Sequence, residues 1–414
     1  MNGSTNPPST ARPRLWVVSE LYYPEQTSTG YFLTEIAEGL AADFDVRAVC
    51  GQPTYSSAGV VAPRREERNG VSIYRMRGTR FPKDRLFLRL LNVVTLSLAT
   101  FWFLLFHIRA GDRVLAVTNP PSVPPLLALV LRLRRAKSVL LVHDVYPEAL
   151  VAVGMTSPDS LLARTMSRVM KATFAAYDHV VVLGDDMARL IAGRRSVAGE
   201  RMSIIPNWGD VDAIAAVDLS ASELAGELNA RDKTIIQYSG NIGRTHDIEL
   251  VLDAARQLDK REDILFLFAG EGGKMPVVEA AAREAGNIVV LPRQPAEKLA
   301  DLLSCATATI IALPPGMTGI SVPSRMYNIM AAGRPIISVG AEDSTLSATV
   351  RADDAGWYCP ANAVALRTLI EEIATPEGRR AASVKGANAR RLVETRYTRN
   401  AVVAQFGTLM RRLT

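Results

Sequence analysis

Short apolar segments alternate with amphipathic segments along the whole chain, and this alternation constrains the fold more than any other feature. The apolar segments are five to seven residues long, and SVLLVHD (138–144) and HVVVLG (179–184) are apolar almost without interruption. Strands of this kind are typical of a parallel sheet that helices cover on both faces.

The alternation runs through the first half of the chain and starts again in the second half. In the first half we predict strands at 14–19, 45–50, 71–77, 113–118, 138–143, 179–184 and 202–206, and helices at 30–42, 86–108, 122–135, 158–177 and 185–193. In the second half we predict strands at 234–240, 264–270, 287–292, 308–313 and 335–340, and helices at 247–260, 275–285, 295–304, 323–332, 361–374 and about 380–414. Two such runs in series predict an α/β fold of two doubly wound, Rossmann-like domains with a cleft between them.

The length agrees with two domains, because a single core rarely serves more than about 250–300 residues and this chain has 414. We assign residues 14–207 to the N-terminal domain and 208–394 to the C-terminal domain. Residues 1–13 are polar and rich in Pro, without the apolar core of a secretion signal. We therefore expect a disordered tail and no secretion.

The cysteines argue for a reducing compartment. Cys50, Cys305 and Cys359 are far apart and odd in number, and no Cys/His spacing matches a metal site. We expect reduced thiols in a cytoplasm and no bound metal.

Positive charge is concentrated in one zone. The chain has a net charge of +6, and residues 61–137 alone hold fifteen basic and four acidic residues. Such a zone favours an anionic partner, which could be a nucleic acid, a phosphorylated substrate or a membrane surface. The zone lacks the interleaved aromatic residues that stack on bases, so we expect no nucleic acid partner.

A long apolar segment lies inside this basic zone and favours the membrane surface. Residues 86–108 are nearly all apolar, although Asn92, Thr95 and Ser97 dilute the first half. Spanning a membrane would separate the strands on either side of the segment, so we prefer a helix lying in the interface. The alternative is a buried core helix. The residues expected at the membrane are Arg80, Lys83, Arg85, Arg89 and Trp102, with RLRR at 132–135 also facing lipid.

The first strand has an unusually polar exit. Gln26-Thr-Ser-Thr-Gly30 separates it from the next helix. Backbone N–H groups and the helix dipole at such a turn suit a phosphate, and Gly30 would permit close approach. The alternative is an ordinary capped loop in which Thr29 is the N-cap.

A second polar group follows the strand at 138–143. HDVYPE (143–148) places His143, Asp144 and Glu148 at a strand end, which in this fold faces the cleft. His143 could contact a developing charge, and an acidic side chain could orient a sugar hydroxyl. The alternative is that Asp144 or Glu148 caps the following helix.

Four turns of the second half share small residues and nearby polar groups. YSGNIGRTHDI (238–248) carries Arg244 next to two glycines and could hold an anion, while FAGEGG (268–273) and LPRQP (291–295) could contact a base. In GISVPSRMYNIMAAGRPIISVG (319–340), the 321–324 turn offers N–H groups at a helix start, and Arg325 and Asn328 share one helix face.

These motifs together resemble a known family. YYPEQTSTG, GQPTY, NPPSVPP, HDVYPE, IPNWGD, SGNIGR, FAGEGG and VPSRMYNIMAAGRPI occur in order over nearly the whole chain. The set resembles the family 4 glycosyltransferases of the two-domain GT-B fold, which are retaining and use nucleotide-sugars. It is similar in particular to the WbuB-like aminosugar transferases of O-antigen and colanic acid assembly.

The resemblance implies a role for each matched residue. It implies catalytic roles for His143, Asp144 and Arg244, and acceptor contacts from Tyr22, Glu25 and Glu148. It implies donor contacts from Thr29, Gly30, Gly240, Asn241, His246, Gly270, Gly272, Arg293, Ser321, Val322, Pro323, Ser324, Arg325 and Asn328. It also implies a hinge after IPNWGD (205–210) and a terminal helix, about 395–414, that crosses back onto the first domain.

The sequence departs from the family pattern at four positions. The usual pair of glutamates would fall at Ile320 and Asn328, and the usual Arg and Lys at Asn241 and His246. Arg244 is a candidate replacement for the lost positive charge. Asn328 falls where the family usually holds the ribose hydroxyls with Glu.

The resemblance and the charge pattern together predict a membrane-associated transferase. We expect it to move a sugar, an N-acetylated amino sugar, from a UDP-sugar donor to a polyprenyl-diphosphate-linked acceptor, without a cofactor. We expect it to lie on the cytoplasmic face of the membrane as a peripheral or monotopic protein. The alternatives are a GT-B-fold UDP-sugar epimerase, a non-catalytic scaffold of a polysaccharide assembly complex and an inactive relative.

Overall fold

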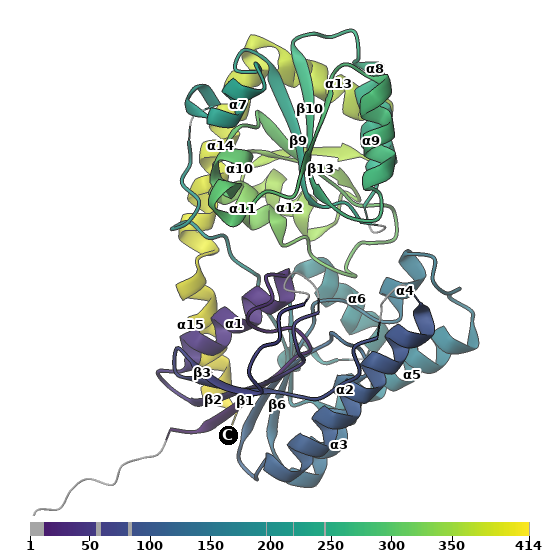
Figure 1. Ribbon diagram of the computed structural model, residues 1–414, viewed down its shortest axis with the longest axis vertical. Helices are drawn as coiled ribbons and strands as arrows, with labels where there is room; N and C mark the ends of the chain where they lie inside the picture. Colours follow the sequence, from purple (N-terminus) through teal and green to yellow (C-terminus); the bar gives the residue numbers. More distant parts are fainter. Residues whose placement is uncertain are drawn as a thin grey trace, which may run out of the picture.

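The computed structural model describes residues 12–54, 59–81, 85–195, 197–217, 219–243 and 246–413. The described chain forms two α/β domains, each built on one sheet with helices on both faces (Figure 1). The sheets are joined by the segment that follows the last strand of the first domain. The final helix returns to the first domain.

The first sheet has eight strands in the order β3-β4-β2-β1-β5-β6-β7-β8. All neighbours are parallel except β3, which pairs antiparallel with β4. The strands are β1 Arg14–Val18, β2 Asp45–Cys50, β3 Arg65–Arg68, β4 Val71–Arg75, β5 Arg113–Val117, β6 Lys137–Leu141, β7 His179–Val182 and β8 Met202–Ile204.

Helices cover both faces of this sheet, as a strand order that reverses at β1 requires. The helices are α1 Ser28–Leu40, α2 Leu86–His107, α3 Val123–Arg134, α4 Glu148–Ala152, α5 Leu161–Ala176 and α6 Asp185–Arg195, with a short η1 at Gly199–Arg201. Helices α2, α3, α5 and α6 pack in sequence side by side, and α1 packs with the final helix, α15.

The second sheet has six parallel strands in the order β11-β10-β9-β12-β13-β14. The strands are β9 Thr234–Asn241, β10 Ile264–Glu271, β11 Ile288–Pro292, β12 Ala308–Ala312, β13 Ile336–Gly340 and β14 Gly356–Pro360. The helices are α7 Glu223–Glu227, α8 Ile248–Gln257, α9 Met275–Glu284, α10 Leu299–Ser304, α11 Arg325–Ala331, α12 Thr345–Ala352, α13 Ala363–Ala374, α14 Pro376–Arg396 and α15 Arg399–Arg412, with η2 Leu219–Ala221 and η3 Ala296–Lys298.

The continuous apolar strands form the cores, as their composition predicts. In β1, the side chains from Leu15 to Val18 are at most 1% exposed, and β12 is buried throughout. Both faces of these strands lie under helices, so no polar alternation is needed. The prediction of two doubly wound domains is confirmed.

Three details differ from the sequence prediction. The strand β3 is the polar tetrapeptide REER at a sheet edge, and its side chains carry no apolar period. The strand β14 is another edge strand that was not predicted. The last helical stretch is two helices, because Thr398 caps a new helix after Tyr397.

The helix α15 docks on the first domain through α1. Gly39 of α1 faces Val403 closely, since an added Cβ would lie 2.6 Å from the Val403 Cγ1 atom. Arg399 binds the Glu35 carboxylate at 2.5 Å, and Arg113 donates to the Met410 carbonyl at 2.7 Å. The chain end therefore ties the C-terminal domain to the N-terminal domain.

The helix α2 is mostly exposed and does not separate its flanking strands. Only 17% of its most apolar window is buried, and the preceding β4 and following β5 belong to the same sheet. The diluting polar residues face inward: Ser97 bonds Ser122 at 2.8 Å, and Thr100 is buried. The structure therefore disagrees with the buried core helix that was the alternative.

Candidate functional site

The carboxyl ends of both sheets meet where the two domains face each other. The Val145 amide, after β6, donates to the Ile320 carbonyl at 2.9 Å. The Ser28 hydroxyl, at the start of α1, lies 2.9 Å from the Ser324 hydroxyl. The first-strand exit, HDVYPE and the 319–325 loop, which are distant in sequence, thus lie together.

His143 is the most distinctive side chain at this junction. Its Nδ1 atom lies 2.9 Å from the Thr29 hydroxyl, and its amide donates to the Thr118 hydroxyl at 3.1 Å. Its Nε2 atom is buried and has no hydrogen-bond partner in the described part of the chain. Burial lowers the pKa of His143 to about 4. The ring is therefore neutral at physiological pH, with one nitrogen open for a ligand.

The structure gives Thr29 and Gly30 different roles from those expected. Thr27, not Thr29, is the N-cap of α1, and its hydroxyl accepts from the Gly30 amide at 3.4 Å. Thr29 orients His143 instead. Gly30 is needed by the loop itself, because an added Cβ would lie 2.8 Å from the Glu25 carbonyl oxygen.

The remaining acidic residues of the first domain are held by internal partners. Asn119 donates to the Asp144 carboxylate at 2.8 Å, and burial raises the pKa of Asp144. Glu148 binds Arg195 at 2.5 Å and Arg194 at 3.3 Å. Glu148 is the first residue of α4, but Pro147 is the N-cap and no side chain caps the helix, so the capping alternative is wrong for α4.

The two other expected acceptor contacts are also occupied or buried. The Glu25 carboxylate accepts from the Thr54 amide at 2.5 Å, and Tyr22 is 3% exposed within the core. Burial raises the pKa of Tyr22 well above its ordinary value. The roles of Tyr22, Glu25 and Glu148 as acceptor contacts therefore stay predictions, and the Tyr22 hydroxyl has no partner in the described part of the chain.

Glycines bring the strand ends of the second domain close together. Gly240 and Gly270 are register partners in β9 and β10, and both have positive φ angles. A Cβ on Gly270 would lie 1.9 Å from the Gly240 carbonyl oxygen. Only glycine fits at 270, so this turn is explained by backbone contact. Gly272 similarly faces the Ile242 carbonyl.

Positive charge at this edge comes from Arg325 and Lys274. The Arg325 guanidinium donates to the Ser239 carbonyl at 3.1 Å and to the Tyr238 hydroxyl at 2.9 Å, and it lies over the Tyr238 ring. The Lys274 ammonium binds the His246 carbonyl at 2.8 Å and Glu249 at 2.6 Å. The sequence analysis missed Lys274, although it directly follows the FAGEGG turn.

His246 does not supply a positive charge. Burial and the nearby Arg325 and Lys274 lower the pKa of His246 to about 3. Its Nδ1 atom accepts from the Gly243 amide at 3.3 Å, so it holds the turn after β9. The neutral ring agrees with the loss of the family's usual positive charge at this position, and the contact of His246 with the donor stays a prediction. Arg244 lies outside the described residues.

The 321–324 loop presents backbone donors toward the first domain. The amides of Ser321, Val322 and Ser324 make no hydrogen bond within the described ranges. Pro323 lies between them, and the Pro323 carbonyl accepts from the Met326 amide at 3.1 Å as α11 begins. The loop thus offers donors next to Ser28.

Three expected donor contacts lie apart from these amides or are already engaged. The Asn328 Oδ1 atom accepts from the Asp210 amide at 3.2 Å, at the connection between the domains. Arg293 pairs with Glu271 at 2.7 Å on an exposed edge, and Asn241 is exposed at the end of β9. Asn328 thus contacts the hinge through one hydrogen bond to its Oδ1 atom, and its contact with a ribose stays a prediction.

The described residues contain no group of three His, Cys, Asp or Glu that could hold a metal ion. The donors gathered at the junction are instead backbone amides, one neutral imidazole and two cationic side chains. This set suits a ligand with phosphate and hydroxyl groups.

Two Rossmann-like domains with their strand ends face to face define the GT-B class of glycosyltransferases. The chain belongs to the glycosyltransferase family that joins two such domains. A "Glycosyl transferase 4-like domain" matches residues 29–208, and "Glycosyl transferases group 1" matches residues 222–390. The protein is therefore a glycosyltransferase.

Two curated relatives carry the same assignment. The chain is 31% identical to the "Probable glycosyltransferase WbjE" of Pseudomonas aeruginosa, over 97% of this chain and 98% of that one. It is 28% identical to the "Putative colanic acid biosynthesis glycosyl transferase WcaI" of Escherichia coli K12, over 75% of this chain and 79% of that one.

Solved structures agree on the fold. Sucrose-phosphate synthase from Thermosynechococcus elongatus superposes with a TM-score of 0.73 at 18% identity, over 97% of this chain and 99% of that one. Anabaena HepE, in complex with UDP and glucose, has a TM-score of 0.72 at 12% identity, over 97% and 100%. WaaG, a glycosyltransferase involved in lipopolysaccharide biosynthesis, has a TM-score of 0.68 at 14% identity, over 96% and 99%.

Proposed function

We propose that this glycosyltransferase moves an N-acetylated amino sugar from a UDP-sugar to a polyprenyl-diphosphate-linked acceptor in cell-surface polysaccharide assembly. The observation that carries the proposal is His143, whose buried Nε2 atom has no partner in the described chain. A buried polar atom without a partner is costly, so it marks a position where a ligand group completes the site.

In this proposal, the donor lies between the two sets of strand ends. The free amides of the 321–324 loop and the Arg325 guanidinium neutralise the leaving diphosphate. When Thr29 donates to Nδ1, the neutral His143 ring carries its hydrogen on Nε2 and can donate to a sugar hydroxyl. HepE, which shares the fold, was solved with UDP-glucose, and this supports a nucleotide-sugar donor.

Retention of the anomeric configuration is supported by the family resemblance. In a front-face reaction, the bond from the anomeric carbon to the diphosphate oxygen breaks and a bond to the acceptor oxygen forms on the same face. The acceptor proton passes to the leaving diphosphate. Neutral His143 then orients the transferred sugar by donating to one of its hydroxyl groups, and no carboxylate nucleophile is required.

The helix α2 supports a lipid-linked acceptor. One face of α2 carries an exposed apolar stripe at helical spacing, and basic residues flank it; the stripe consists of Phe87, Leu90, Val94, Leu98, Trp102 and Phe106. Arg80, Arg85 and Arg89 are exposed near the start of the helix, while Lys83 lies outside the described residues. We propose that this stripe lies in the cytoplasmic face of the membrane as a monotopic contact. The descriptions of WcaI in colanic acid biosynthesis and of WaaG in lipopolysaccharide biosynthesis support polysaccharide chemistry.

The test is a transfer assay with purified full-length protein in detergent. A panel of UDP-, GDP-, TDP- and ADP-sugars is offered with a polyprenyl-diphosphate-linked sugar, and the product is resolved by mass spectrometry and its anomeric configuration by NMR. We expect transfer from a UDP-N-acetylamino sugar, with loss of turnover in Arg244→Ala by orders of magnitude.

Two other results would contradict the proposal. Breakdown or epimerisation of UDP-sugar without any acceptor would assign the site to an epimerase. A folded protein that no nucleotide-sugar protects against thermal unfolding would favour the scaffold alternative.

A further inference from the structure

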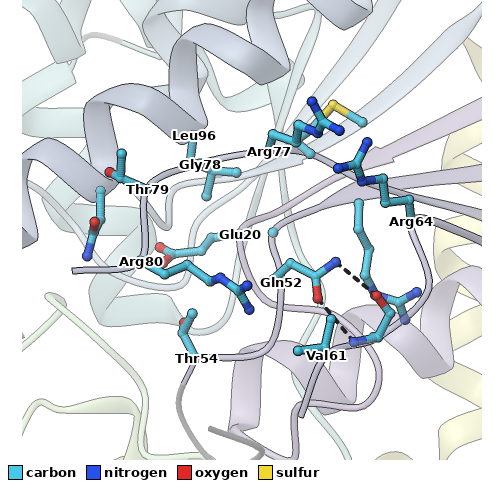
Figure 2. A pocket seen from close by; sticks show the side chains of 15 residues that line it. Glu20, Gln52, Thr54, Val61, Arg64, Arg77, Gly78, Thr79, Arg80 and Leu96 are labelled. Carbon is cyan, nitrogen blue, oxygen red and sulfur yellow. Dashed lines mark hydrogen bonds between the residues drawn. The ribbon is translucent and has the colours of Figure 1, made fainter. Parts of the chain in front are cut away.

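A second site lies in the first domain, at the same sheet edge as His143. A cavity of about 350 Å³ opens at the carboxyl ends of β1, β2 and β4, and the first half of α2 closes one side (Figure 2). Its wall is made by Glu20 after β1, by Gln52 and Thr54 after β2, and by the 76–80 segment after β4. Asn92 and Leu96 of α2 complete it.

The cavity is lined by several guanidinium groups. The side chains of Arg64, Arg77 and Arg80 line it and make no hydrogen bond or ion pair with the described residues. Arg75, in contrast, is buried and pairs with Glu66 at 2.5 Å. Glu20 is the one carboxylate among the described residues of the lining, so these residues keep an excess of positive charge. Guanidinium groups in this density favour a phosphate-bearing ligand.

The wall that carries Arg77 and Arg80 is fixed to α2. The Thr79 amide donates to the Thr95 hydroxyl at 3.0 Å, and the Asn92 side chain makes two hydrogen bonds to the Phe81 backbone, of 3.0 and 2.9 Å. An added Cβ on Gly78 would lie 3.2 Å from the Leu96 Cβ atom, so the segment lies directly on the helix. This anchoring holds both cations beside α2.

The place of the cavity in the domain indicates what kind of ligand carries the phosphate. The exposed apolar stripe of α2 starts at the cavity end of the helix, where Asn92 faces the cavity and Val94 faces outward. His143 stands at the carboxyl end of β6, on the same edge of the same sheet. A ligand that fits has a lipid tail, then an anionic group, then a sugar, in this order along the surface.

We propose that the Arg64, Arg77 and Arg80 cavity binds the diphosphate of the lipid-linked acceptor. This proposal rests on the proposed function and names the acceptor subsite within it. The tail then follows α2 into the membrane, and the sugar points along the sheet edge toward His143. The anion is the diphosphate of the acceptor rather than a phospholipid headgroup or the donor.

The test uses full-length protein in detergent and the double variant Arg77→Gln/Arg80→Gln. Binding of farnesyl diphosphate is measured by calorimetry, and farnesol serves as the uncharged ligand. The matched control is Arg164→Gln/Arg168→Gln, which removes the same charge from exposed positions on α5. Arg64→Gln provides a third, single variant of the cavity.

We expect the cavity variants to bind farnesyl diphosphate at least tenfold more weakly, while the control binds it like the wild type. In the transfer assay, the KM for the acceptor rises by a similar factor and the KM for the nucleotide-sugar is unchanged. Melting temperatures show that the variants are folded.

Three results would overturn the proposal. They are unchanged farnesyl diphosphate binding in the cavity variants, an equal loss in the control, and a loss confined to binding of phosphatidylglycerol vesicles, which would assign the cations to membrane headgroups. The outcome is separable from the proposed function. If farnesyl diphosphate binding depends on the cavity but no sugar is transferred, the cavity proposal stands and the proposed transfer reaction fails. If sugar is transferred and the cavity variants leave the acceptor KM unchanged, the proposed transfer reaction stands and the cavity proposal fails.

Discussion

A single buried imidazole shows how burial sets chemistry at the scale of a residue. His143 is 7% exposed, and its low pKa has desolvation as its cause. Thr29 and Thr118 fix the ring and its backbone, which leaves Nε2 as the one uncommitted atom. A neutral donor held this rigidly can orient a sugar hydroxyl without moving a proton.

His143→Ala should lower kcat by about 10²–10³-fold, the usual loss when one preorganised donor is removed. Thr29→Val, which leaves the ring unoriented, should give a smaller loss. The matched control is His179→Gln, because His179 also lies on this sheet but bonds only Ser203 in the described structure. Steady-state kinetics with saturating donor measures the effect. A His143→Ala enzyme within threefold of wild type would contradict the role.

The buried histidines also predict how stability depends on pH. The pKa values of His143 and His246 are about 4 and about 3 in the folded protein, whereas an unfolded histidine titrates near 6.5. Below pH 6.5 the unfolded chain binds more protons, so the free energy of unfolding falls as the pH falls toward 4. The slope approaches roughly 1.4 kcal/mol per pH unit for each histidine.

Urea denaturation at pH 7.5, 6.0 and 5.0 measures this slope, and His143→Gln should reduce it. Above pH 6.5 both states are deprotonated at these residues, so the variant should show no change in slope there. If wild type and His143→Gln lose stability in parallel between pH 6.5 and 5, the buried neutral histidine is not the cause.

The sequence predicted where the site lies better than it predicted the partners and the protonation of the residues there. Glycines and polar residues after apolar strands correctly indicated the meeting edge of the two sheets. The sequence could not show that Glu148 forms an ion pair with Arg195, or that Asn328 accepts a hydrogen bond from the Asp210 amide, because those partners come from remote segments. It also could not show that desolvation keeps His246 neutral.

At the scale of an element, α2 has one face that packs on the domain and one face that is exposed and apolar. Its polar side chains face the domain and form hydrogen bonds there. Asn92 and Thr95 bond the 79–81 segment, and Ser97 bonds Ser122. Its outward face is left apolar. From the sequence alone, these residues only make the helix less apolar. Its packing against the domain is needed to tell which of them face the domain and which face outward.

Replacing Phe87, Trp102 and Phe106 by Ser should weaken binding to anionic vesicles by more than about 100-fold, because each aromatic contributes roughly 1.5–3 kcal/mol when it is fully buried in lipid. These side chains are 72%, 55% and 71% exposed, so the melting temperature should change little. Val364→Ser/Val384→Ser removes two exposed apolar residues from the second domain as the control.

Vesicle co-sedimentation measures the effect. Equal sedimentation of the triple variant and the wild type would refute the membrane role of α2. A loss in the Val364→Ser/Val384→Ser control would show that exposed apolar area anywhere on the molecule is sufficient.

At the scale of the whole molecule, a buried carboxylate joins the two domains, in addition to the chain hinge, α15 and the Val145–Ile320 and Ser28–Ser324 hydrogen bonds. Asp186, at the start of α6, accepts hydrogen bonds from the Gly319 amide at 3.2 Å and from the Thr345 amide and hydroxyl at 3.1 and 2.5 Å. Gly319 begins the loop whose amides face the proposed diphosphate. The contact between domains and the donor site are thus mechanically connected.

Asp186→Asn should therefore raise the KM for the nucleotide-sugar by about tenfold or more, since hydrogen bonds to a charged group are worth roughly 1.5–3 kcal/mol each. The side-chain NH2 group of the introduced Asn would also face a hydrogen-bond donor of Gly319 or Thr345 instead of accepting from it. Asp185→Asn is the matched control, because Asp185 is exposed and makes no hydrogen bond in the described part of the chain. Kinetics gives the KM, and small-angle scattering gives the radius of gyration, which should increase only in Asp186→Asn. If the two variants have the same KM and the same radius of gyration, this carboxylate does not couple domain closure to donor binding, and the other contacts between the domains set the position of the second domain.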